Sequence, residues 1–155
     1  MAQATTKDWL DGIQKGLLQQ LTENKGALPK GFNQDRFILN SITVIRDMLR
    51  DSKKKKQLQE IDYTSIPICL AKGAFLGLDF FNGECYAIPY GGEMKFQTDY
   101  KGEIKLCKRY SKNEIKDIFA KVVREGDFFE ESVDSGVQNV VYKPLPFSNK
   151  PLVGA

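Results

Sequence analysis

Two adjacent glycines, Gly91 and Gly92, separate two segments in which apolar and polar side chains alternate. Paired glycines in this position favour a two-residue hairpin turn, because both central residues of that turn take positive φ angles. The turn fixes the register, so the pairing of all other residues follows by counting from Tyr90 opposite Glu93. Further from the turn, this register predicts that Ile88 pairs with Lys95 and that Tyr86 pairs with Gln97.

The two faces of this predicted ribbon differ in chemistry. The outer face carries Tyr86, Ile88, Tyr90, Lys95 and Gln97, and the core face carries Cys85, Ala87, Pro89, Met94, Phe96 and Thr98. Phenol rings can stack on bases, and ammonium and carboxamide groups can bind phosphates. The same residues are also ordinary on a solvated sheet face. Both interpretations of the outer face stay open at this point.

A basic segment follows the ribbon directly. The spacing predicts a helix over 100–112, with cations at Lys101, Lys105, Lys108, Arg109 and Lys112 along one face. Ile104 and Cys107 and, less cleanly, Leu106 and Tyr110 are left to pack against the protein. A stripe of like charges is tolerated more easily when a ligand neutralises it. We therefore expect a surface suited to a polyanion, although a solvated lysine face would show the same pattern.

The net charge of the 155-residue chain is only +3, so binding to nucleic acid would depend on where the charges lie. The acids gather in a later stretch, at Glu125, Asp127, Glu130, Glu131 and Asp134. The segment 95–112 is left strongly positive. A run of four lysines at 53–56 could contact phosphate, but a charged turn after a helix is the favoured interpretation.

Several of these motifs together resemble the phage RecT-type single-strand annealing recombinases. The resemblance rests on the stretch from Tyr86 to Arg109, with Pro89, Phe96-Gln97 and Tyr100-Lys101-Gly102. Flanking segments occur in the same order as in that family: Ala27-Leu28-Pro29-Lys30, Gly77-Leu78-Asp79, and Val122 to Glu130. The similarity spans roughly 28–155.

The resemblance implies binding of single-stranded DNA and annealing of complementary strands in phage homologous recombination. It implies an oligomeric ring or filament that works without ATP, and an annealed duplex intermediate. The candidate DNA-binding residues are Tyr86, Lys95, Gln97, Tyr100, Lys101, Lys105, Lys108 and Arg109. No catalytic residue, metal site or cofactor is expected, and Mg²⁺ would at most promote annealing without a fixed site. A companion phage exonuclease and a host single-strand binding protein are the partners that the resemblance suggests.

Members of this family are usually longer than this chain. We expect one DNA-binding and annealing domain over 1–155, truncated at its C-terminal end, because the last residues look like the start of a further strand. The segment 1–26, which includes Trp9, is a candidate interface helix between protomers.

The rest of the chain predicts an α+β fold. Apolar periodicity predicts helices over 8–22, 33–50 and 65–77, with Asn33 as an N-cap. Strands are expected over 116–125, 128–133 and 138–143, after the hairpin and the basic helix. Small residues at Ala71, Gly73, Ala74 and Gly77 should let the third helix approach another element, most simply the sheet.

Several functions are excluded or disfavoured by missing residues. The chain has no histidine, which removes histidine-based triads and metal sites, and it has no phosphate-binding loop of the GxxxxGK[ST] kind. Glu103 and Lys105, with Asp99 or Asp79, imitate the acid and Glu-x-Lys set of metal-dependent nucleases, but that set requires a strand and a helix is predicted here. The main alternative to an annealing protein is a sequence-tolerant single-strand binding module, and a nuclease is the weakest interpretation.

Targeting and redox signals are also informative. Three widely spaced cysteines in apolar contexts indicate small buried residues in a reducing compartment. No apolar stretch reaches the length of a membrane span, and the first residues lack the apolar run of a signal peptide. We expect a cytoplasmic protein in a bacterial host.

Overall fold

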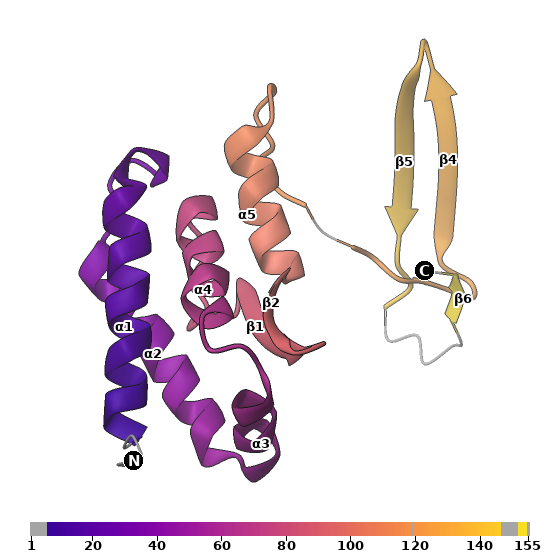
Figure 1. Cartoon of the computed structure of the whole chain (residues 1–155). Coiled ribbons are helices and arrows are strands. Elements are labelled where there is room, and N and C mark those ends of the chain that lie inside the picture. The colour runs from indigo at the N-terminus through magenta and orange to yellow at the C-terminus, as the bar shows by residue number, and fades with distance from the viewer. Residues whose placement is uncertain (1–5, 119, 147–151, 155) are drawn as a thin grey trace. The chain divides into compact units, whose positions relative to one another are not determined.

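A computed structural model describes residues 6–118, 120–146 and the backbone of 152–154. The chain forms two compact units, Met1–Ile115 and Lys116–Ala155. Five α-helices and a hairpin make up the described part of the first unit, and short antiparallel strands make up that of the second (Figure 1). The α+β fold class is confirmed. The expectation of a single domain over 1–155 stays a prediction.

The core of the first unit is built on α1 (Thr6–Glu23), whose apolar residues recur every three or four positions. Leu10, Ile13, Leu17 and Leu21 are buried. Trp9 is partly buried and its ring lies tilted against Tyr63, 5.6 Å between centroids. Because this stripe is used inside the unit, an interface between protomers would have to use the other side of α1. That role of 1–26 stays a prediction.

The second helix, α2 (Gln34–Arg50), begins at the predicted N-cap. The Asn33 side chain accepts a hydrogen bond of 2.9 Å from the Arg36 backbone amide, and Phe37, Ile38, Ile42 and Ile45 are buried. A short 3-10 helix, η1 (Lys25–Ala27), precedes it, and the segment 28–33 connects the two. The predicted start and end of this helix are confirmed.

The lysine run is not a turn. It belongs to a nine-residue helix, α3 (Ser52–Glu60). The Asp51 carboxylate caps this helix by accepting hydrogen bonds from the amides of Lys53 and Lys54, and Leu58 anchors it in the core. The expectation of a charged turn was therefore wrong, because a cap, one buried leucine and good helix formers were enough to form a helix.

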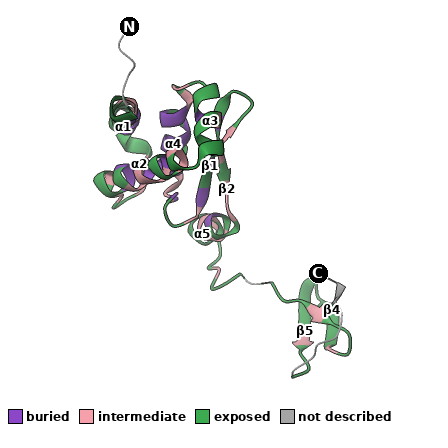
Figure 2. Cartoon of the chain, turned by 90° about the horizontal axis from the view of Figure 1, so that it is seen from below, coloured by how far each residue is buried: buried purple, intermediate pink, exposed green. Residues whose placement is uncertain are grey.

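The small-residue helix α4 (Ser65–Leu76) packs against both α1 and the hairpin. Close approach explains its glycine: a Cβ at Gly73 would lie 2.6 Å from the Phe80 ring. The helix ends where Gly77 takes a left-handed conformation at φ +63°. The predicted extent and the close packing of this helix are confirmed. Figure 2 shows the buried positions concentrated on α1, α2, α4 and β1.

The hairpin consists of β1 (Cys85–Tyr90) and β2 (Glu93–Thr98) in the predicted register. Gly91 and Gly92 take φ angles of +61° and +79° in the turn. On the inner face Cys85, Ala87 and Met94 are buried, whereas Phe96 is partly buried. Every residue of the predicted outer face is exposed.

The basic helix α5 (Tyr100–Tyr110) is capped by the Asp99 side chain, which accepts from the Lys101 amide. It ends before Lys112, which lies outside the helix. Cys69 and Cys85 are buried as expected, and burial raises the pKa of each thiol to about 12. Cys107 is exposed, so the expectation that it packs inside was wrong. The inner side of α5 is made by Gly102 and by Leu106, which was expected to pack. Tyr110 was also expected to pack, but it is exposed.

The second unit contains β3 (Val123–Arg124), β4 (Phe128–Asp134), β5 (Val137–Lys143) and β6 (Leu152–Gly154). β4 and β5 form an antiparallel hairpin that turns at Ser135 and Gly136, both with positive φ, and β3 pairs with β6. The strands predicted over 128–133 and 138–143 are confirmed. In the described residues 116–118 and 120–125, only Val123 and Arg124 pair with another strand, so the strand predicted over 116–125 is wrong for most of that described part.

Candidate nucleic-acid interface

The outer face of the β1–β2 hairpin presents large side chains to solvent. Tyr86 is 45% exposed and Tyr90 74% exposed, with Ile88 between them. On β2, Lys95 and Gln97 are exposed, and the Lys95 ammonium lies 2.5 Å from the Glu93 carboxylate. Exposed rings on this hairpin, beside hydrogen-bonding groups, form a platform on which bases can stack.

One hydrogen bond ties this platform to the start of α5. The Tyr86 hydroxyl donates to the Asp99 carboxylate at 2.6 Å. This bond raises the pKa of Tyr86 and lowers the pKa of Asp99, since it favours the neutral phenol and the ionised carboxylate. Asp99 also caps α5, so a single carboxylate fixes both the tyrosine and the helix start. Tyr100 and Lys101 follow at once, with the Lys101 ammonium 5.9 Å from the centre of the Tyr100 ring.

The basic stripe of α5 is divided between two environments. Lys101, Lys108 and Arg109 are exposed, and Lys105 is half-buried. Lys105 donates a 2.6 Å hydrogen bond to Glu84, and Arg109 donates one of 2.7 Å to the Leu76 carbonyl. The helix can lie this close because Gly102 has no side chain to separate it from the chain before β1. The predicted stripe therefore exists, but two of its cations face the end of α4.

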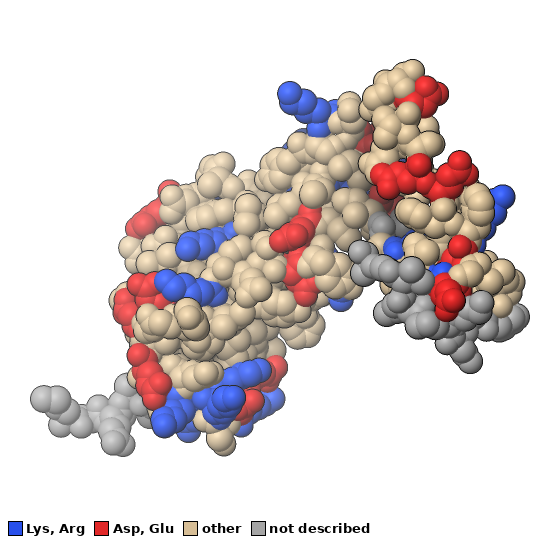
Figure 3. Space-filling model, turned by 90° about the vertical axis from the view of Figure 1, so that its right-hand side faces the viewer, with Lys and Arg blue, Asp and Glu red and all other residues tan. Residues whose placement is uncertain are grey.

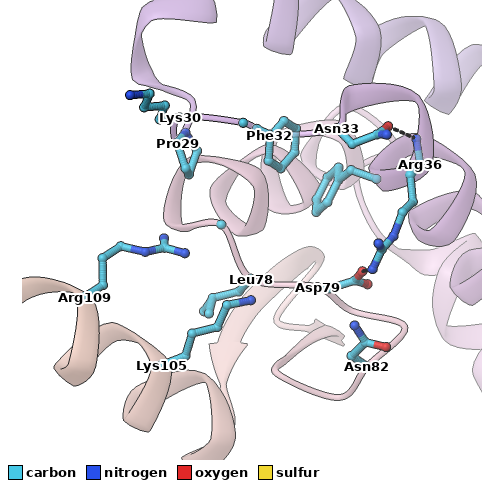
Figure 4. Close-up of a pocket in the computed structure, with 13 residues that line it drawn as sticks. Pro29, Lys30, Phe32, Asn33, Arg36, Leu78, Asp79, Asn82, Lys105 and Arg109 are labelled. Carbon is cyan, nitrogen blue, oxygen red and sulfur yellow. Dashed lines mark hydrogen bonds and ion pairs between the residues drawn. The ribbon is translucent and has the colours of Figure 1, made fainter. Parts of the chain in front are cut away.

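These two cations line a pocket, which we call the basic pocket. It is about 290 Å³ in volume and lies among the segment before α2, the start of α2, the end of α4 and α5 (Figure 4). Its cations are Lys30, Arg36, Lys105 and Arg109, and its apolar wall includes Phe32, Phe37 and Leu78. Asp79 is the one acid in the lining. Its carboxylate accepts a hydrogen bond of 2.9 Å from Asn40 and lies 4.0 Å from the Arg36 guanidinium.

Lys30 and Arg36 were not among the predicted site residues. Both were visible in sequence, since Lys30 ends the Ala-Leu-Pro-Lys motif and Arg36 lies three residues after the N-cap Asn33. Nothing in the spacing, however, indicated that they come together with α5, some seventy residues later in the chain. The Ala-Leu-Pro-Lys motif could have indicated Lys30 as a site residue, if the lysine in it had been considered as a cation for DNA binding.

The nuclease-like set is not assembled as its chemistry requires. Glu103 and Lys105 lie on helix α5, as expected, where Glu103 accepts from the Thr98 hydroxyl and Lys105 binds Glu84. Asp99 is engaged by Tyr86. Among the described residues, no group of three or more His, Cys, Asp or Glu is placed to hold a metal ion.

Charge on the surface is distributed in separate patches. Figure 3 shows Lys and Arg gathered at the lower end of the first unit, where α3 lies. Lys53 to Lys56 are all exposed there. A contact between this helix and phosphate stays a prediction. No helix in the described part of the chain is long and apolar enough to span a membrane.

Comparison with known protein families shows which family the chain belongs to. The model of the RecT family matches residues 35–155, which is most of the chain and includes the hairpin, α5 and the second unit. The chain belongs to the RecT family. The resemblance seen in the sequence is thereby confirmed. RecT membership connects the chain with DNA recombination and with annealing of single strands. No curated protein and no solved structure matches the chain.

Proposed function

We propose that this RecT-family chain binds single-stranded DNA on the β1–β2 hairpin and α5, and anneals complementary strands without ATP as an oligomer. The observation that carries the proposal is the junction at Asp99. Its carboxylate accepts hydrogen bonds from the Tyr86 hydroxyl and the Lys101 backbone amide, and the Lys101 ammonium lies 5.9 Å from the centre of the exposed Tyr100 ring. Rings for bases and cations for the backbone then lie next to one another.

Annealing suits such a surface because the reaction is thermodynamically downhill. The protein has to neutralise phosphate repulsion and keep the strand extended, and both follow from a basic surface with stacking groups. No nucleotide hydrolysis is required. Mg²⁺ would add to the screening of phosphates without a fixed site on the protein.

Some of the candidate residues would contact the bases or sugars of the DNA, and the others would contact its phosphates. Tyr86, Gln97 and Tyr100 would contact bases or sugars, and Lys95, Lys101, Lys105, Lys108 and Arg109 would contact phosphates. Adjacent protomers would extend the surface along one strand, and a phage exonuclease and a host single-strand binding protein are proposed as partners.

Strand pairing tests the proposal directly. Two complementary oligonucleotides that carry a donor and an acceptor dye should anneal faster with the protein than without it, in the absence of ATP. Gln97→Ala and Lys101→Ala should weaken single-strand binding, and Lys101→Ala should reduce the slope of log affinity against log salt by about 0.7. Lys15→Ala, at an exposed position on α1, is the matched control and should behave as the wild type.

The alternative function is a single-strand binding module that does not anneal. Light scattering during stepwise addition of the two strands separates it from the proposal. An annealing oligomer should grow into large assemblies, whereas a monomer under all conditions that still binds single strands tightly would leave only the binding module.

A further inference from the structure

A hollow of about 260 Å³ lies between α1 and α2, and we call it the α1–α2 groove. Its lining includes Leu18 of α1 and, from α2, Asp35, Ile38, Leu39, Ile42 and Arg46. Leu18 is 44% exposed and Leu39 is 65% exposed. The volume is below the lower limit of roughly 300 Å³ for small-molecule sites. The groove is therefore better suited to side chains that protrude from another protein surface.

Four of the lining residues form a stripe along α2 whose spacing is the same from either end. Asp35, Leu39, Ile42 and Arg46 are separated by four, three and four residues. With about 3.6 residues per turn, all four fall on one side of the helix. The midpoint between Asp35 and Arg46 is also the midpoint between Leu39 and Ile42. A half-turn about that point therefore exchanges the acid with the base and the exposed leucine with the buried isoleucine.

The charges at the two ends of this stripe are not used within the chain. Asp35 and Arg46 are exposed, and among the residues that the structure describes no ion pair engages either side chain. The other two arginines of α2, Arg36 and Arg50, each lie within 4.0 Å of a carboxylate. An apolar strip with opposite, unpaired charges at its ends is complementary to the same strip turned end for end.

We propose that the α1–α2 groove is a contact between two copies of this chain, related by a two-fold axis, with their α2 helices antiparallel. Leu39 of each copy would enter the groove of the other copy beside Ile42, and Asp35 of each would pair with Arg46 of the other. At about 1.5 Å per residue, each end charge lies about 8 Å from the axis along the helix. Helices that cross at about 20° would keep these pairs within reach of an arginine side chain.

The contact differs from the one that would repeat along a DNA strand. A two-fold contact closes after two copies, whereas protomers placed side by side along one strand need a head-to-tail contact that repeats. One pair of helices also buries little surface compared with the roughly 1,000 Å² of a stable interface. We therefore expect weak association between free protomers and stronger association where copies are already held close together.

The symmetry of the contact matches that of a duplex. The two strands of a duplex are antiparallel, and a two-fold axis relates two protomers in the same way. If each protomer carries one strand, the contact would bring two complementary strands together in the orientation that pairing requires. This consequence rests on the proposed function, whereas the contact itself does not.

Sedimentation of the protein without DNA tests the contact. The wild type should shift from monomer to dimer as its concentration rises. Leu39→Asp should stay monomeric, because it places two charges at the centre of the contact, and it should still fold because Leu39 is exposed. Lys15→Asp, at an exposed position of α1 outside the groove, is the control and should dimerise. A wild type that is monomeric at every concentration, or association that Leu39→Asp leaves unchanged, would overturn the inference.

Charge reversal tests the two-fold symmetry. Asp35→Arg alone and Arg46→Asp alone should each dimerise several-fold more weakly than the wild type, because like charges would meet at both ends of the contact. An equal mixture of the two variants should recover the association of the wild type, since both ends of a mixed pair carry opposite charges. Recovery would also show that both variants fold. A mixture that associates no better than either variant alone would contradict the two-fold arrangement.

An annealing assay tests the consequence for strand pairing. Leu39→Asp should bind a short oligothymidylate as the wild type does, because no candidate DNA-binding residue lines the groove, but it should anneal complementary strands several-fold more slowly. An unchanged annealing rate in a variant that no longer dimerises would overturn the link to annealing. If the wild type does not anneal strands at all, the proposed function falls, and sedimentation without DNA still decides whether the contact exists.

Discussion

Replacing Gly102 with alanine should destabilise the protein, although the same change inside most helices is stabilising. Alanine is favoured over glycine in a helix interior by about 1 kcal/mol. At this position, however, a Cβ would lie 2.1 Å from the carbonyl oxygen of Glu84 and 3.3 Å from a methyl carbon of Leu78. The oxygen belongs to the backbone, so it cannot turn away as a flexible side chain would. Helix α5 and the start of β1 would have to separate by more than 1 Å to restore an ordinary contact.

The magnitude follows from the contacts that this separation disturbs. Overpacking of this kind costs about 1–3 kcal/mol. The same Glu84 carbonyl accepts a 3.0 Å hydrogen bond from the backbone amide of residue 99, and loss of that bond costs about 1 kcal/mol more. After the gain in helix propensity is subtracted, the free energy of unfolding should fall by about 1–3 kcal/mol. For a unit of this size that corresponds to a fall of roughly 4–12 °C in melting temperature.

Thermal unfolding followed by circular dichroism measures the effect, with Gly26→Ala as the matched control. Nothing lies within 4 Å of the Cβ that Gly26 would gain, so this variant should melt close to the wild type. The affinity of Gly102→Ala for single-stranded DNA should also fall, because α5 moves relative to the hairpin. A Gly102→Ala protein that melts at or above the wild-type temperature would refute the argument that close packing of α5 requires a glycine.

Three further outcomes follow from single residues. Phe96→Ala should lower the free energy of unfolding by about 3 kcal/mol, because the Phe96 ring packs on the core. Gln97→Ala should leave the urea midpoint of unfolding unchanged. A stable Phe96→Ala protein beside a destabilised Gln97→Ala protein would contradict the hairpin register. The pKa of Asp99 is lowered chiefly by the hydrogen bond from Tyr86, so the stability it contributes is present above about pH 4 and is lost as pH falls through the lowered pKa. Asp99→Asn should therefore make acid unfolding less steep below about pH 4, and identical acid limbs would argue against that role. A maleimide near neutral pH should label only Cys107 in the folded protein, because burial raises the pKa of the other two thiols to about 12; labelling of three thiols before unfolding would contradict their burial.

The hairpin was predictable in detail because its information is local. Gly91 and Gly92 set the turn, and a two-residue turn leaves no freedom in the register of the strands that flank it. The residues of the outer face then followed from the alternation of side chains along each strand. The start of α2 was predictable for a similar reason, since Asn33 and the apolar stripe that follows lie within a few residues of each other.

Predictions failed where the outcome depended on a weak local preference or on distant contacts. The lysine run was expected to be a turn because charge suggested solvation, but Asp51 caps a helix there and Leu58 anchors it. Most of the described residues in the segment 116–125 lie outside any strand, because an apolar alternation forms a strand only where a partner strand pairs with it. Among the residues of that segment which the structure describes, Val123 and Arg124 alone have a partner strand.

The basic stripe shows most clearly why a helical wheel gives only part of a binding site. The wheel predicted five cations on one face of the helix, but it does not predict which other part of the protein packs against that face. Gly102 brings α5 against the chain before β1, and that contact turns Lys105 and Arg109 toward the end of α4. Lys105 and Arg109 both line the basic pocket, whereas Lys101 and Lys108 do not. The position of α5 therefore decides which of its cations stay on the exposed stripe alone and which also line the basic pocket.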